Sequence, residues 1–84
     1  MSKLTKDESF LIKLYEQAKD EGDLGLEVNC YSFGKKMVLT ERVVKNIVRD
    51  LAQANFIKKV DQDTISLTQN GINLAQKFQE GWVF

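Results

Sequence analysis

The fold of this protein is set by residues 39–78, which read LTERVVKNIVRDLAQANFIKKVDQDTISLTQNGINLAQKF. Thr40 is a favourable N-cap, and apolar residues then recur at helical spacing as far as Ala54, which predicts an amphipathic helix over residues 40–54. Residues 56–60 and 64–67 are rich in strand-forming side chains and flank a polar tip at 61–63, a pattern typical of a β-hairpin. Thr68 then caps a last helix with apolar contacts as far as Phe78.

The first part of the chain predicts another helix and one ambiguous segment. Thr5 and Glu8 form a capping-box signature, and the helix that follows ends near Gly22. Residues 26–29 suit a short strand, and Asn29 could cap a brief helix over residues 30–36. The alternative is an extended segment over residues 28–33, since Val, Tyr and Phe suit strands. We favour the short helix, because with residues 37–39 as a turn it completes a helix-turn-helix.

Composition narrows the class of protein. The chain has 84 residues, of which 43% are hydrophobic and 29% charged, and this predicts a single globular domain over residues 1–84. No apolar run approaches the ~20 residues that span a bilayer, and the N-terminus lacks a signal-peptide core, so we expect a cytoplasmic protein. With no histidine and one cysteine, Cys30, most hydrolytic and metal-dependent sites are excluded. We expect no enzyme, no cofactor and no metal.

Charge is unevenly distributed along the chain. The formal net charge is zero, yet residues 35–59 hold seven basic side chains against two acidic ones, a balance of +5. This basic segment contains the predicted helix over residues 40–54. A local positive field matters more than net charge when a protein meets a polyanion, so nucleic acid is the first partner to test.

Two short motifs resemble a known family. Residues 51–57, LAQANFI, resemble the end of a recognition helix that runs into a wing strand. Residues 65–75, ISLTQNGINLA, resemble the second wing strand and following helix of MarR- and PadR-like winged-helix regulators, in which a glycine follows the Leu-Thr threonine by three positions; Thr68 and Gly71 match. The resemblance implies a mainly α (α+β) winged helix-turn-helix: a three-helix core, a two- or three-stranded β-wing and a C-terminal helix. The spacing has a physical reason, because threonine caps the helix and glycine, which lacks a Cβ, lets the helix approach its neighbour closely.

The resemblance also implies a function. These families bind double-stranded DNA as dimers, with the third helix in the major groove and the wing beside the backbone. The residues that would face the groove are Arg42, Lys45, Asn46 and Arg49. The residues that would contact phosphate are Lys35, Lys36, Lys58 and Lys59. We therefore expect a DNA-binding transcriptional regulator.

Two departures from the family pattern favour an alternative. The wing tip carries Asp61 and Asp63, which would repel phosphate, and the turn before residue 40 lacks the glycine often found there. We interpret the two aspartates as turn formers rather than metal ligands. Together with the zero net charge, these features favour a winged-helix protein–protein interaction module that does not bind DNA.

The apolar C-terminus predicts a contact surface. Trp82 and Phe84 are residue types common at interfaces, and Phe10 and Leu14 of the first helix could share the surface. The partner would be a second copy in a homodimer or another protein. The alternative is that the tail folds back over the core.

Overall fold

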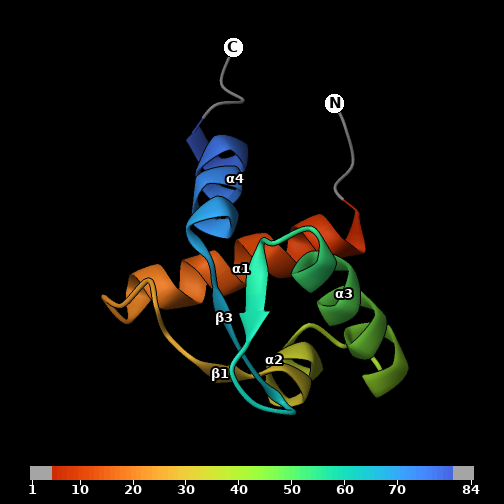
Figure 1. Cartoon of the computed structure of the whole chain (residues 1–84). Coiled ribbons are helices and arrows are strands. Elements are labelled where there is room, and N and C mark those ends of the chain that lie inside the picture. The colour runs from red at the N-terminus through yellow and green to blue at the C-terminus, as the bar shows by residue number, and fades with distance from the viewer. Residues whose placement is uncertain (1–4, 81–84) are drawn as a thin grey trace.

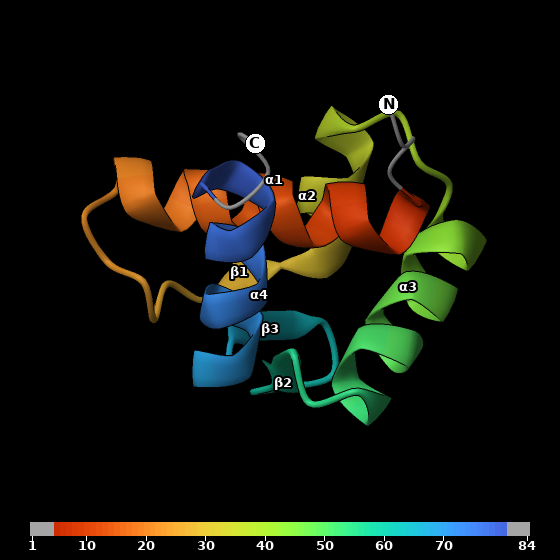
Figure 2. The same cartoon turned by 90° about the horizontal axis from the view of Figure 1, so that it is seen from above.

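A computed structural model of the chain describes the backbone of residues 5–80 and the side chains of residues 5–78. The described part contains four helices and one three-stranded antiparallel sheet, so the α+β class is confirmed (Figure 1). The elements in chain order are α1 (Lys6–Asp20), β1 (Val28–Asn29), α2 (Cys30–Lys36), α3 (Glu41–Gln53), β2 (Ile57–Lys59), β3 (Thr64–Leu67) and α4 (Gln69–Glu80). The β2–β3 hairpin lies between α3 and α4 in both views (Figure 2).

The start of α1 has the predicted capping box. The Thr5 hydroxyl accepts from the Glu8 backbone N–H at 3.1 Å, and the Glu8 carboxylate accepts from the Thr5 N–H at 2.8 Å. Two N–H groups that lack helical partners are thereby satisfied. Gly22, with φ +72°, follows the end of the helix as predicted.

The ambiguous segment forms both a strand and a helix. Val28 pairs with Ile65 and Asn29 with Thr64, so β1 joins the sheet beside β3 in the order β1-β3-β2. The Asn29 side chain then accepts from the N–H groups of Tyr31 and Ser32, both at 3.0 Å, and caps α2. The predicted helix over residues 30–36 is confirmed, and the extended alternative over residues 28–33 is wrong.

The chain turns tightly at the end of α3 before it enters the β2–β3 hairpin. Asn55 has φ +66°, the left-handed conformation predicted for it. Its N–H donates to the Ala52 carbonyl at 3.0 Å, and the Phe56 N–H donates to the Leu51 carbonyl at 2.9 Å. This Schellman arrangement turns the chain directly from α3 into β2.

Thr68 and Gly71 join the start of α4 to the end of α3. The Thr68 hydroxyl accepts from the Gly71 N–H at 3.1 Å and donates to the Asn55 carbonyl at 2.6 Å. A Cβ at Gly71 would overlap the carbonyl oxygen of Phe56. The glycine therefore permits the close approach that its spacing from Thr68 predicts.

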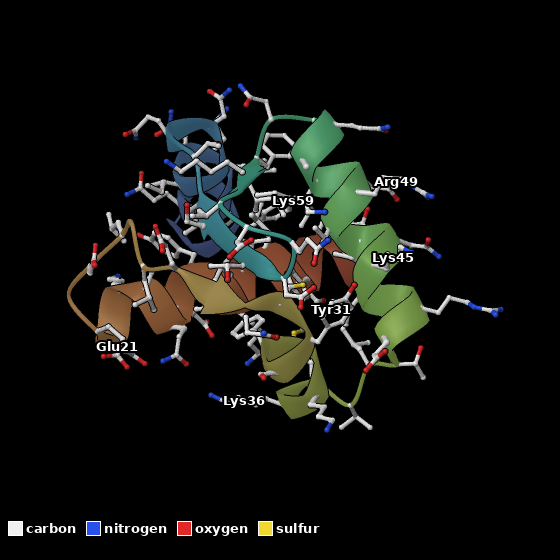
Figure 3. The ribbon with its side chains drawn as sticks, turned by 60° about the horizontal axis from the view of Figure 1, so that its bottom comes forward. Glu21, Tyr31, Lys36, Lys45, Arg49 and Lys59 are labelled. Carbon is white, nitrogen blue, oxygen red and sulfur yellow. The ribbon has the colours of Figure 1, made fainter. Side chains whose placement is uncertain are left out.

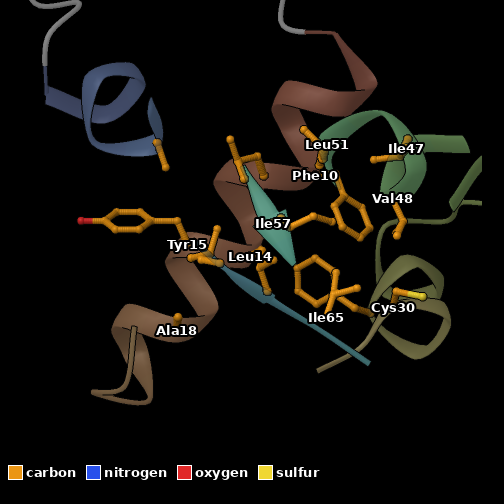
Figure 4. Close-up of a cluster of buried hydrophobic side chains, with 14 of the residues drawn as sticks. Phe10, Leu14, Tyr15, Ala18, Cys30, Ile47, Val48, Leu51, Ile57 and Ile65 are labelled. Atoms are coloured by element: carbon orange, nitrogen blue, oxygen red, sulfur yellow. The ribbon is translucent and has the colours of Figure 1, made fainter. Parts of the chain in front are cut away.

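The core lies where α1, α2 and α3 meet the sheet, and Figure 4 shows part of it. The rings of Phe10 and Phe33 pack edge to face with centroids 5.2 Å apart. Phe10 and Leu14 are both 0% exposed. The prediction that these two residues form an interface is therefore wrong, because the apolar stripe of α1 faces inward. Trp82 and Phe84, the other residues of that prediction, lie outside the described residues.

The turn between α2 and α3 contains a strained residue. Val38 has φ +60° and is 92% exposed. It occupies the left-handed position of a second Schellman arrangement, in which the Leu39 N–H donates to the Gly34 carbonyl and the Val38 N–H to the Lys35 carbonyl, both at 3.0 Å. Glycine usually fills this position. The turn before α3 has no glycine, and the β-branched Val38 adopts the left-handed conformation instead.

Replacing Val38 with glycine is expected to stabilise the protein by about 1 kcal/mol, because the left-handed strain disappears and almost no buried surface is lost. For a chain of this size the midpoint of thermal unfolding would rise by roughly 4–8 °C. The matched control is Val38→Thr, which keeps the branched Cβ and should leave the midpoint nearly unchanged. Equal midpoints for Val38→Gly and the parent chain would contradict the assignment of strain to this residue.

None of the helices within residues 5–80 combines the length and apolar character needed to cross a bilayer.

Candidate nucleic-acid interface

Helix α3 presents two chemically distinct faces. One face is buried and consists of Val44, Ile47, Val48 and Leu51. The other is exposed and carries Arg42, Lys45, Asn46 and Arg49. Burial of the apolar face fixes the helix to the core, so the polar face is held outward in a fixed orientation.

A groove of about 350 Å³ lies between α3, the β2–β3 hairpin and the start of α2. Three cations from two elements line it, Lys45 and Arg49 from α3 and Lys59 from β2, and Figure 3 shows them together with Tyr31 (Figure 3). The remaining lining residues are the amides Asn46, Gln53 and Gln62 and the less polar Cys30, Tyr31, Val48 and Ala52. No carboxylate belongs to this lining among the residues that the structure describes. The groove therefore has a positive rim and a largely apolar floor.

The three groove cations differ in whether a carboxylate of the protein forms an ion pair with them. Arg49 Nε lies 3.5 Å from Asp50 Oδ1, an exposed ion pair of little energetic weight. Among the side chains of residues 5–78, no carboxylate is recorded within ion-pair distance of Lys45 or Lys59. These two ammonium groups are therefore free to meet an external anion.

Half of the eight predicted DNA-binding residues meet in this groove, namely Lys45, Asn46, Arg49 and Lys59. Arg42 is exposed on α3 but does not line the groove. Lys58 alternates with Lys59 along β2 and so points to the opposite face of the sheet.

The two lysines at the end of α2 lie elsewhere. Lys35 lines a smaller depression with Thr40 and Glu41, and Lys36 lines another with Asn29. Figure 3 shows Lys36 beyond α2, away from the labelled groove residues. These lysines belong to the same basic segment of sequence but not to the same site.

Sequence reasoning missed the other six lining residues, which are Cys30, Tyr31, Val48, Ala52, Gln53 and Gln62. A signal existed for Gln53, which follows Lys45 and Arg49 at successive spacings of four on the same helical face. Tyr31 and Gln62 reach the groove only because β1 pairs with β3 and the Cys30 N–H donates to the Asp63 carbonyl at 2.8 Å. No pattern of neighbouring residues in the sequence predicts a contact between segments that lie so far apart in the chain.

The acidic tip of the hairpin lies outside the groove lining. The Asp61 side chain accepts from the Gln62 N–H at 2.8 Å, which fits the interpretation of this residue as a turn former. Asp63 contributes its backbone carbonyl to the contact with α2. Among the described residues there is no group of three or more side chains able to hold a metal ion.

Two groups of the floor stay uncharged at neutral pH. Burial, and then the charge of Asp63, raises the pKa of the Cys30 thiol, so the reactive thiolate is suppressed. Burial likewise raises the pKa of Tyr31, with smaller contributions from Cys30, which is negatively charged only at alkaline pH, and from the carboxylates of Asp63 and Glu41. The two floor groups themselves thus carry no negative charge, but the Asp63 carboxylate lies close enough to act on both of them.

Comparisons with protein-family models, curated proteins and solved structures found no match.

Proposed function

We propose that this protein is a small winged-helix DNA-binding protein that acts as a transcriptional regulator, with α3 as its recognition helix. The order of elements supports the winged-helix part: α2 and α3 are joined by a short turn, and an antiparallel hairpin separates α3 from α4. The observation that carries the function is the groove, where cations from α3 and β2 converge without a carboxylate.

The dimensions of α3 suit a DNA major groove. Its 13 residues give a helix about 20 Å long, and the ~12 Å width of the major groove admits a helix. In that position Arg42, Lys45 and Arg49 can donate to phosphate or to guanine acceptors. Asn46 can bond adenine through both atoms of its amide.

The hairpin would contribute through its base rather than its tip. Lys59 faces the same groove as the α3 cations, so it can bind the phosphate strand that flanks the helix. The exposed Asp61 and Asp63 side chains do not line the groove, although the charge of Asp63 acts on its floor at Cys30 and Tyr31. The phosphate contact would therefore be made by the cations at the base of the hairpin and not by its acidic tip.

The neighbouring residues Lys58 and Lys59 provide a matched test. We expect Lys59→Ala to weaken binding to short random-sequence duplexes by about tenfold and to reduce the dependence of log K on log salt by about 0.9, because one phosphate contact is lost. Lys58→Ala removes the same charge from the other face of the same strand and should change both quantities little. Fluorescence anisotropy over a series of salt concentrations measures them. Equal losses in the two variants would mean that net charge, not the groove, governs binding.

The alternative function is a protein–protein interaction module on the same fold. The exposed aspartates of the hairpin tip and the zero net charge favour it. Its partner would be another protein or a second copy in a homodimer. No binding to duplex DNA at low salt would favour this alternative, whereas DNA binding that is insensitive to the groove cations would contradict only the assignment of the groove as the binding surface.

A further inference from the structure

The groove between α3 and β2 contains apolar and aromatic residues that binding to duplex DNA alone does not require. Phosphate contacts need only the cationic rim, whereas the floor is lined by Cys30, Val48 and Ala52, with the half-buried ring of Tyr31 at its side. Its volume of about 350 Å³ is at the lower end of the range for small-ligand sites, roughly 300–1,000 Å³. The groove is therefore large enough to hold a small planar group.

Tyr31 is half-buried and packs against the hydrophobic core, so part of its side chain stays exposed. Among the described residues the recorded aromatic pair is Phe10 with Phe33, and no ring packs on Tyr31. The ring comes from the first turn of α2, on the opposite side of the groove from Lys45 and Arg49. A flat group that entered between these elements would meet an aromatic side chain and the positive rim together.

We propose that this groove is a subsite for one unpaired nucleotide, whose base packs against Tyr31 and the apolar floor and whose phosphate is bound by Lys45, Arg49 and Lys59. Every nucleobase has a π face that stacks on aromatic side chains, and the phosphate supplies the charge that the rim lacks. Asn46, Gln53 and Gln62 place amide groups at the edge, where they can bond the base.

A base within a B-form duplex cannot reach the floor. Its faces are covered by the neighbouring base pairs, so only an unpaired or extruded base can insert. The same chemistry, a base with a phosphate, belongs to an unpaired position in a DNA strand and to a free nucleotide. This inference rests on the proposed function and deepens it, because it names the form of nucleic acid that the groove prefers.

The test uses the full chain and three probes: a blunt duplex, the same duplex with a short single-stranded overhang containing 2-aminopurine, and deoxyadenosine monophosphate. We expect the overhang to tighten binding by about tenfold relative to the blunt duplex, within the range for stacking one base. Stacking on Tyr31 should also quench the fluorescence of 2-aminopurine. Tyr31→Leu should lose the preference and the quenching, whereas Tyr31→Phe, which keeps the ring, should retain both.

The outcomes separate this inference from the proposed function. Equal affinity for blunt and overhang duplexes, with no quenching and no binding of the mononucleotide, overturns the subsite and leaves duplex binding standing. Failure to bind any of the three probes overturns both. Saturable, Tyr31-dependent binding of deoxyadenosine monophosphate without a gain from the overhang supports the subsite and identifies a free nucleotide as its ligand. The quenching measurement on the parent chain needs no variant, so it holds even where Tyr31→Leu fails to fold.

Discussion

Replacing Gly71 with alanine is expected to destabilise the protein by about 3 kcal/mol, the upper end of the usual cost of inserting a methyl group into a packed region. The new Cβ would overlap the carbonyl oxygen of Phe56 and also approach its carbonyl carbon and the Leu67 side chain. The carbonyl cannot easily rotate away, because it accepts from the Thr68 N–H at 3.2 Å. Relief of the overlap would therefore require α4 to move away from the end of α3.

The expected loss corresponds to a fall of roughly 12–24 °C in the midpoint of thermal unfolding for a chain of this size. The control is Gly25→Ala, where the new Cβ would lie 3.4 Å from Asp23 Oδ1 in an exposed loop. Circular dichroism during heating compares the two variants. A Gly71→Ala protein as stable as Gly25→Ala would contradict the close approach of α4 to Phe56.

Removal of all three groove cations should have the largest effect on binding. We expect the variant with alanine at Lys45, Arg49 and Lys59 to lose at least about 100-fold in affinity for duplex DNA at low salt, because three charged contacts disappear. The slope of log K against log salt should fall by about 2.7. Anisotropy titration of labelled duplex at several salt concentrations gives both values.

A second triple variant controls for net charge. Lys13, Lys19 and Lys77 are exposed on α1 and α4, away from the groove, and their replacement by alanine removes the same three charges. This control should retain most of the affinity of the parent chain. An equal loss in both triple variants would show that long-range attraction is sufficient, and the assignment of the groove as the binding surface would be wrong.

Local capping signals explain why most elements could be predicted from the sequence. Thr5, Asn29 and Thr40 each accept backbone N–H bonds at the start of the predicted helix, over at most three residues of sequence. The partner of each cap lies within the same short segment, so the pattern is visible in the sequence. The resemblance of Thr68 and Gly71 to a family spacing predicted the helix cap and a close approach at Gly71, but not the bond from the Thr68 hydroxyl to the Asn55 carbonyl, thirteen residues away.

Long-range contacts explain what could not be predicted. The apolar stripe of α1 shows that Phe10 and Leu14 pack against something, but it does not say whether the partner is the core or a second chain. The left-handed conformation of Val38 carried no sequence signal, because valine is among the residues least suited to it. The groove is also invisible in the sequence, since Tyr31, Lys45 and Lys59 come from three separate elements.

The most direct test of nucleic-acid binding at the groove is an NMR titration of the full, isotope-labelled chain with duplex DNA at low salt. We expect amide shifts to change mainly at Tyr31, along α3 around Lys45 and Arg49, and at Lys59, with little change in the middle of α1. Raising the salt concentration should reverse these changes. No shift at saturating DNA, or shifts concentrated on α1 and α4, would contradict the assignment of the groove as the DNA-binding surface.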